Sequence, residues 1–271
     1  MQYISKKEVK LPKRKATSKK GDNGRVLIIG GSKDYVGAVA LAGLAALRSG
    51  VDWVTVAAPE KIAWAVNSLS SDLVTVKLKG DYISLKHVEK IKKLAKKYDV
   101  VLIGNGMGLR NETKQFLKKI IKIKNLKVVD ADGLNQIRLQ DVKNSILTPH
   151  HKEFSILLKN SGLDENNFRK SLKNNVILLK ASVDQIISKN KVLFNKTGNA
   201  GMSKAGTGDV LAGLTAGFLG QGLSLFQSAV NAAYFSGLIG DILLKKKKGF
   251  TYLASDMVEE IKRFHRKEII L

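Results

Sequence analysis

The sequence predicts an α/β protein with a mostly parallel central sheet that is covered by helices on both faces. Short apolar runs alternate along the chain with segments at helical spacing, and this alternation is typical of parallel sheets. Glycines and polar residues come directly after three of the apolar runs, where such sheets place their ligand-binding loops. One later pair of short runs surrounds Lys189-Asn190, which predicts an antiparallel hairpin at the sheet edge.

The expected elements follow in chain order. Strands are expected over residues 26–29, 54–58, 100–103, 128–129 and 176–179, with the hairpin over 185–194. Helices are expected over 38–47, 84–97, 112–123, 208–219 and 224–244, where the residue pattern is helical. No repeat or flexible linker interrupts these elements. We therefore expect residues 1–271 to form one domain, with a loosely held basic arm over 1–18.

Composition narrows the function classes. The chain has no cysteine, which excludes disulfides and thiolate chemistry and fits a reducing cytoplasm. The first residues lack an apolar signal core and no run is long enough to span a bilayer, so we expect a cytoplasmic protein without membrane attachment. The formal net charge is +24. Because most lysines lie on amphipathic segments, this charge favours a solvated surface, and a basic nucleic-acid-binding module is the alternative.

The most informative stretch runs from Gly198 to Asp209. Glycine recurs every few residues there, and a helix-like run follows. Such a loop lets main-chain N–H groups approach a phosphate, and the helix dipole attracts the same anion. Asp209, at the junction, can take a proton from a hydroxyl that attacks a phosphoryl group, or it can simply cap the helix. No P-loop occurs, and the spacing of Gly104–Gly108 is not that of a Rossmann motif.

Two further features place polar groups near strand ends. In Thr148–Glu153, Glu153 can hold magnesium through water beside a nucleotide phosphate, and His150 can contact a substrate. The alternative is a helix that starts at Pro149, with the preceding threonine as its cap and the glutamate in its first turns. The paired histidines have no third ligand nearby and do not predict zinc. Lys180 ends an apolar run, where it can neutralise a phosphate or be solvated.

Several segments together resemble the ADP/ATP-dependent NAD(P)H-hydrate dehydratases. They are Lys20–Ser32, Tyr35–Ala38, Leu41–Ala42, Ala45–Gly50, Asp130–Asn135, Leu147–His150, Glu153–Phe154, Gly198–Met202 and Gly206–Leu211. Together they cover nearly the whole chain in the family's order, which is far more specific than one motif. The resemblance implies a ribokinase-like fold and an enzyme that repairs hydrated NADH and NADPH, with ADP or ATP driving the loss of water.

The resemblance also implies roles for individual residues. Asp209 would be the catalytic base and would contact the hydrated nicotinamide nucleotide together with Ala38, Gly106 and His150. The nucleotide-binding residues would be Lys180, Ala181, Ser182, Val183, Asp184, Asn199, Gly206, Thr207 and Gly208. Glu153 matches a magnesium-associated motif of ribokinase-like kinases. Phosphorylation of the ring hydroxyl would create a good leaving group, and elimination of phosphate would restore NADH or NADPH.

Four positions depart from the family's usual pattern. They are His151-Lys152 in place of Pro-Gly, Lys19 in place of histidine, Ala181-Ser182 in place of Gly-Ala, and Lys204-Ala205 in place of Thr-Gly. None of them removes Asp209, so they bear on nucleotide preference more than on reaction type. Lys204 adds a charge that could accept a third phosphate, although we expect ADP to serve at least as well as ATP.

The resemblance leaves partners and one near alternative open. A ribokinase-like small-molecule kinase, of the thiazole or pyrimidine type, would use the same aspartate and glycine loop but keep the phosphate on its product. We expect a homo-oligomer. Because only about twenty residues precede the first matching segment, we expect the epimerase domain that many relatives carry to be a separate chain.

Overall fold

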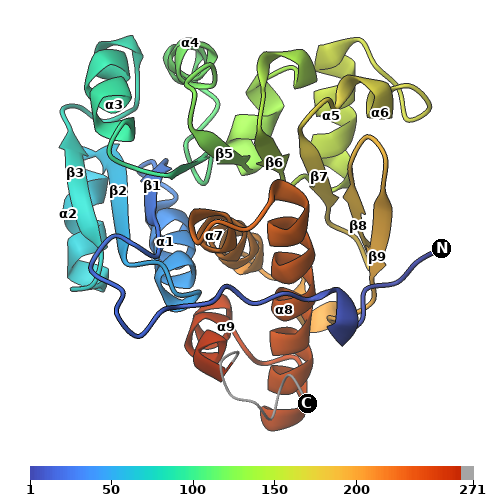
Figure 1. Ribbon diagram of the computed structural model, residues 1–271. Helices are drawn as coiled ribbons and strands as arrows, with labels where there is room; N and C mark the ends of the chain where they lie inside the picture. The colour runs from blue at the N-terminus through green and yellow to red at the C-terminus, as the bar shows by residue number, and fades with distance from the viewer. Residues whose placement is uncertain (264–271) are drawn as a thin grey trace.

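A nine-stranded sheet organises the protein in the order β3-β2-β1-β4-β5-β6-β7-β8-β9 (Figure 1). The computed structural model describes residues 1–263, and residues 264–271 lie outside this description. The first seven strands are parallel, and β8 is antiparallel to both β7 and β9. The strands are β1 Arg25–Ile29, β2 Trp53–Pro59, β3 Val74–Leu78, β4 Val100–Ile103, β5 Leu126–Val129, β6 Ser145–Leu147, β7 Val176–Leu179, β8 Asp184–Ile187 and β9 Val192–Asn195. The predicted mostly parallel sheet and its edge hairpin are therefore confirmed.

Helices cover both faces of the sheet. One core cluster involves α1 Val36–Arg48, α2 Glu60–Leu69, α7 Thr207–Gly220, α8 Leu225–Lys246 and α9 Ala254–Glu260. The opposite cluster involves α3 Val88–Ala95, α4 Asn111–Ile120, α5 His151–Ser161 and α6 Phe168–Ser171. Short 3-10 turns lie at Lys6–Glu8, Leu85–His87, Ala131–Gln136, Leu139–Asp141, Ala200–Met202 and Ile261–Arg263. No helix within residues 1–263 is long and apolar enough to cross a membrane.

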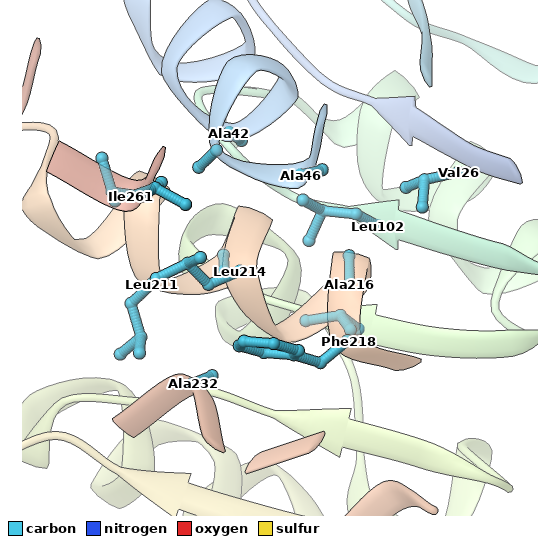
Figure 2. Close-up of a cluster of buried hydrophobic side chains, with 14 of the residues drawn as sticks. Val26, Ala42, Ala46, Leu102, Leu211, Leu214, Ala216, Phe218, Ala232 and Ile261 are labelled. Carbon is cyan, nitrogen blue, oxygen red and sulfur yellow. The ribbon is translucent and has the colours of Figure 1, made fainter. Parts of the chain in front are cut away.

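Helix α7 lies against the middle of the sheet and carries the end of the glycine-rich loop. Figure 2 shows Leu211 and Phe218 of α7 between Ala46 of α1 and Ala232 of α8. The approach to α1 is close, since a β-carbon on Gly213 would lie 2.2 Å from the carbonyl oxygen of Ala42. Only glycine permits this distance. The packing holds the first turn of α7 beside the loop after β4.

The basic arm is anchored, so the expectation that it is loosely held is wrong. Residues 2–4 pair with β9, where Ile4 N donates to Phe194 O at 2.8 Å and Phe194 N donates to Gln2 O at 3.0 Å. The arm then runs across α8 (Figure 1), where the buried Asn231 side chain bonds both N and O of Lys10. Ile4 itself is 8% exposed. The arm thus covers part of an otherwise open sheet edge.

Deleting residues 1–12 is expected to lower the free energy of unfolding by about 2–4 kcal/mol. Loss of the buried Ile4 side chain alone accounts for about 1.5–3 kcal/mol, and the uncovered β9 edge favours aggregation. Urea unfolding and light scattering of the shortened chain measure both effects. A deletion limited to residues 1–2, which leaves Ile4 in place, is the control and should change stability much less. Unchanged stability of the longer deletion would contradict the anchoring.

Candidate active site

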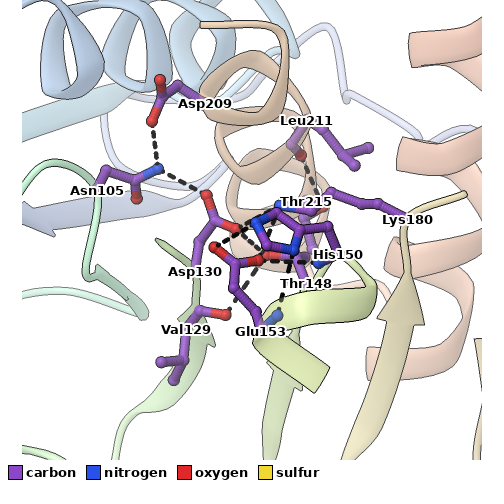
Figure 3. A network of polar contacts seen from close by, with 10 residues as sticks. All are labelled: Asn105, Val129, Asp130, Thr148, His150, Glu153, Lys180, Asp209, Leu211 and Thr215. Atoms are coloured by element: carbon purple, nitrogen blue, oxygen red, sulfur yellow. Dashed lines mark hydrogen bonds and ion pairs between the residues drawn. The ribbon is translucent and has the colours of Figure 1, made fainter. Parts of the chain in front are cut away.

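The loops after four neighbouring strands meet around one buried carboxylate. Asp130 follows β5 and is 2% exposed. It accepts hydrogen bonds from Asn105 Nδ2 at 2.9 Å, after β4, and from Thr148 Oγ1 at 2.8 Å, after β6. Lys180 Nζ, after β7, donates to Asp130 Oδ1 at 3.0 Å (Figure 3). The loop after β1 joins them, because Gly31 N donates to the carbonyl oxygen of Asn105. The loops after β1, β4 and β5, where glycines and polar residues follow the apolar runs, therefore lie together at one end of the sheet.

Asp209 projects from the first turn of α7 toward this network. The helix begins after Gly206, whose φ of +91° lies in the left-handed region that favours glycine. Asp209 Oδ1 accepts a hydrogen bond from Asn105 Nδ2 at 2.7 Å, and α7 has no side-chain cap. The helix-cap alternative is therefore wrong. Burial raises the pKa of Asp209 to about 6, against a lowering by the Asn105 hydrogen bond.

Lys180 pairs with two carboxylates and is not the solvated strand end that its position alone also allowed. Its side chain is 20% exposed, and Nζ lies 3.0 Å from Asp130 Oδ1 and 3.7 Å from Glu153 Oε2. Burial alone would lower the pKa of this amine, but the two carboxylates outweigh burial and raise it, with a further contribution from Asp209. A permanent positive charge therefore faces the start of α7, because a β-carbon on Gly208 would lie 3.6 Å from the amine.

His150 and Glu153 form the start of α5. His150 is the N-cap: its Nδ1 accepts from Glu153 N at 3.2 Å, and Glu153 Oε2 accepts from His150 N at 2.9 Å. The helix therefore begins at His151, two residues after Pro149. The alternative in which the threonine caps a helix from Pro149 is wrong, since Thr148 donates to Asp130 instead. Glu153 does lie in the first turn of the helix, as that alternative also expected. The His150 side chain is half exposed.

The remaining residues of the predicted nucleotide site form two groups, the turn that follows Lys180 and the glycine loop. Residues Ala181, Ser182 and Val183 form the turn into β8, which Asp184 closes by accepting from Ala181 N at 3.0 Å. Burial raises the pKa of Asp184.

The loop side of that predicted site is held by its own polar contacts. Asn199 accepts from Tyr252 Oη at 2.7 Å and donates to Asp241 Oδ1 at 3.1 Å. Thr207 Oγ1 donates to the carbonyl oxygens of Met202 and Lys204. The side chains of Asn199 and Thr207 thus shape the glycine loop, which leaves main-chain N–H groups for a ligand.

Ala38 and Gly106 are neighbours at the other side of the network. A β-carbon on Gly106 would lie 3.2 Å from the β-carbon of Ala38 and 2.6 Å from that of Tyr35. Gly106 follows Asn105 directly, so this pair lies one residue from the contact with Asp209. The structure therefore brings the predicted substrate residues Ala38 and Gly106 to the Asp209 side of the site.

Lys204 does not point its charge at the glycine loop. Its Nζ donates to the carbonyl oxygens of Phe250 and Tyr252, the latter at 2.8 Å. It also lies 5.4 Å from the centroid of the Tyr252 ring. Two of the three hydrogens of this ammonium group are therefore used within the chain.

Sequence reasoning identified the loops but assigned no role to Asn105 or Asp130, and it considered Thr148 only as a helix cap. Asp130 and Thr148 each follow a buried strand directly, and Asn105 lies two residues after another, so a polar residue near a strand end was the available signal. Asp132 belongs with them: its pKa is raised by burial, although Gly108 N donates to its carboxylate at 2.8 Å. Asp130, Glu153 and Asp209 act electrostatically on Lys180, and Asp132 acts on Asp209 from the same end of the sheet.

The donor set fits magnesium that arrives with phosphate, not a metal cage built by the protein. No group of three or more histidine or acidic side chains within the described chain is arranged to hold a metal ion. Magnesium commonly keeps several waters and takes one or two carboxylates plus substrate phosphates. Glu153, whose side chain is 10% exposed and partly occupied by its helix, suits contact through water.

The family comparison covers nearly the whole chain. A family model described as NAD(P)H-hydrate dehydratase matches residues 26–263. A bifunctional NAD(P)H-hydrate repair enzyme of Methanothermobacter thermautotrophicus is 42% identical in an alignment 270 residues long, which covers 93% of this chain and 52% of that protein. The chain thus spans about half the length of such relatives. An ADP-dependent (S)-NAD(P)H-hydrate dehydratase of Cenarchaeum symbiosum is 33% identical, over 92% of this chain and 91% of that protein.

Solved structures agree with the fold. A ribokinase-like superfamily protein of Enterococcus faecalis matches 98% of this chain and 95% of its own, with a TM-score of 0.85 and 26% identity. An ADP/ATP-dependent NAD(P)H-hydrate dehydratase of Bacillus subtilis, co-crystallised with ATP and Mg²⁺, matches 97% of this chain and 96% of its own, with a TM-score of 0.79 and 25% identity. The predicted ribokinase-like fold is confirmed.

Proposed function

The chain belongs to the NAD(P)H-hydrate dehydratase family, and from this membership we propose that it converts NADH hydrate or NADPH hydrate back to the reduced coenzyme. The reaction is a hydro-lyase reaction in which ADP or ATP donates a phosphoryl group to the ring hydroxyl. Loss of phosphate then restores the ring double bond. Within the site, the observation that carries the proposal is Asp209, a partly buried carboxylate at the glycine loop with a pKa of about 6.

A carboxylate with this pKa is suited to act as general base. At pH 7 it is mostly ionised, and it binds a proton more strongly than an ordinary aspartate does. Its Oδ1 is occupied by Asn105, so Oδ2 is the atom that accepts the proton of the hydroxyl as the oxygen–phosphorus bond forms. The protonated neutral form is compatible with its buried surroundings.

Lys180 and the loop amides are suited to the transferred phosphoryl group. The amine lies next to Gly208, where its charge opposes the negative charge on phosphoryl oxygens in the transition state. The main-chain N–H groups of Gly206 and Gly208, at the start of α7, add donors, and the helix dipole acts in the same direction. Magnesium, when bound with the nucleotide beside Glu153, supplies further charge neutralisation.

The remaining assignments complete the proposal. Ala38, Gly106 and His150 contact the hydrated nicotinamide nucleotide, and Lys180–Asp184, Asn199 and Gly206–Gly208 line the nucleotide. A homo-oligomer, one domain over residues 1–271, a cytoplasmic location and a separate epimerase chain stay predictions. The members of the family with twice this length are bifunctional repair enzymes by name.

Incubation with NADH hydrate, magnesium and ADP or ATP tests the proposal. NADH absorbance should return only with nucleotide present, together with one equivalent of free phosphate. A stable phosphorylated product without NADH would instead favour a small-molecule kinase of the thiazole or pyrimidine type. Binding of random-sequence DNA without nucleotide binding would favour the nucleic-acid alternative.

ADP is expected to support the reaction at least as well as ATP. Lys204, the extra cation nearest the loop in sequence, is held by the carbonyl oxygens of Phe250 and Tyr252, so it offers little to a third phosphate. The measurement is kcat/KM for each nucleotide at saturating NADH hydrate and equal magnesium. A tenfold preference for ATP, equal to about 1.4 kcal/mol, would contradict this, and Lys204→Thr would then be the first variant to examine.

A further inference from the structure

One side-chain amide joins the two central carboxylates of the site. Asn105 is fully buried, and its Nδ2 donates to Asp209 Oδ1 at 2.7 Å and to Asp130 Oδ2 at 2.9 Å (Figure 3). An amide nitrogen carries two hydrogens, so each carboxylate receives one. The flipped amide would place its oxygen against both carboxylates. The chemistry of the partners therefore fixes the orientation of Asn105.

This orientation leaves the other end of the amide unsatisfied. Asn105 Oδ1 is buried and has no hydrogen-bond partner within the described chain. A buried acceptor without a partner is destabilising. Both hydrogens of the amide nevertheless donate to carboxylates. The orientation of Asn105 therefore stabilises the two carboxylates at the expense of its own oxygen.

The charges around Asp209 explain why such a donor matters. Asp130 and Asp132 both raise the pKa of Asp209, in addition to the larger effect of burial. Lys180 opposes them, but its amine is paired with Asp130 and Glu153. Among the hydrogen bonds of residues 1–263, the one from Asn105 is the direct donor to Asp209.

We propose that Asn105 is a positioning residue that keeps Asp209 ionised and leaves its Oδ2 free to take the substrate proton. The proposal rests on the proposed function and deepens it. Asn105 also separates two carboxylates that would otherwise repel or share a proton. Without the amide, Asp209 is a protonated acid over more of the physiological pH range, and a protonated acid cannot act as base.

A carboxyl titration tests this without any turnover. In protein with ¹³C-labelled aspartate carboxyls, Asp209→Asn identifies the signal of Asp209, and Asn105→Leu removes both donors while keeping the number of side-chain heavy atoms. The pKa of Asp209 is expected to rise by about one pH unit. An unchanged pKa in the folded variant would overturn the proposal. Asn105→Ala, which adds no bulk, gives the same test if the leucine variant does not fold.

The pH dependence of kcat/KM gives the second readout. In Asn105→Leu the acidic side of the kcat/KM profile, its acid limb, should shift to higher pH by about one unit. This shift lowers kcat/KM on the order of fivefold at pH 6 and much less above pH 8. Nucleotide affinity should stay within a few fold. A loss of rate that is equal at every pH, with an unmoved limb, would assign Asn105 a merely structural role.

Asn125 supplies a matched control. Its Nδ2 also donates two hydrogen bonds, to Ala95 O at 2.9 Å and Tyr98 O at 2.7 Å, just before β5 and away from Asp209. Asn125→Leu should lower stability and leave both the Asp209 pKa and the acid limb unchanged. If no wild-type turnover of NADH hydrate is found, the proposed function fails, while the carboxyl titration still decides the role of Asn105.

Discussion

Asp209→Asn is expected to lower kcat by about a hundred- to ten-thousandfold while ADP affinity stays within a few fold. Loss of a general base typically costs that much in rate. Asparagine has nearly the same shape and can still accept the hydrogen bond from Asn105 through its oxygen, but it cannot take a proton. Return of NADH absorbance measures the rate, and calorimetry measures ADP binding. Retained turnover would show that Asp209 is not the base.

The same substitution should raise stability at neutral pH. The pKa of Asp209 is raised to about 6 from an ordinary 3.8, mainly by burial, so the folded protein binds this proton more tightly than the unfolded chain does. As the pH rises from about 4 to about 6, the free energy of unfolding therefore falls. Above that range the ionised group remains destabilising. Asp209→Asn should be more stable than wild type at pH 8 and similar at pH 4. The exposed Asp72→Asn is the control.

Lys180→Met is expected to lower the free energy of unfolding by about 3–5 kcal/mol, because it leaves Asp130 and Glu153 buried without their cation. Turnover should also be lost, since the pKa of Asp209 rises further and the phosphoryl group loses its nearest amine. Urea unfolding at pH 7 is the measurement.

The exposed pair of Lys92 and Glu89, 2.9 Å apart, provides the contrast for Lys180. Lys92→Met should cost less than about 1 kcal/mol, because solvent screens such a pair and each side chain loses freedom on forming it. Equal effects of Lys92→Met and Lys180→Met would mean that the network around Asp130 is not tightly coupled. Lys180→Arg, which keeps the charge but changes its shape, should retain more stability than Lys180→Met.

Strands and helices with a full apolar pattern were predictable from sequence. Each expected strand and helix corresponds to an element of the structure, although the helix over 84–97 begins as a 3-10 turn and becomes regular at Val88. The elements that were not predicted have weak patterns. β3 lies at the sheet edge with an exposed first residue, β6 has three residues, and α2 follows directly after Pro59. α9 has only seven residues.

The candidate site was predictable in its loops but not in its connections. Glycine spacing and the strand-end positions pointed to residues 198–209 and to Lys180. That Asn105 joins Asp130 to Asp209 depends on pairing between β4 and β5 and on the placing of α7, which no local pattern encodes. The same holds for Lys204, whose carbonyl partners near Tyr252 lie 48 residues further along the chain.

The anchored arm also sets an order of folding events. Lys10 and its partner Asn231 are 221 residues apart, and the arm's other partner, β9, is likewise made late in synthesis. Residues 2–10 are therefore synthesised well before β9 and Asn231, and they acquire these native contacts only after those later segments are made. Contacts of such sequence separation close slowly, because a long loop must be ordered before they form. Until then the apolar Ile4 and the open edge of β9 are both exposed, and that interval is the step at which a nascent chain is most prone to pair with a neighbour.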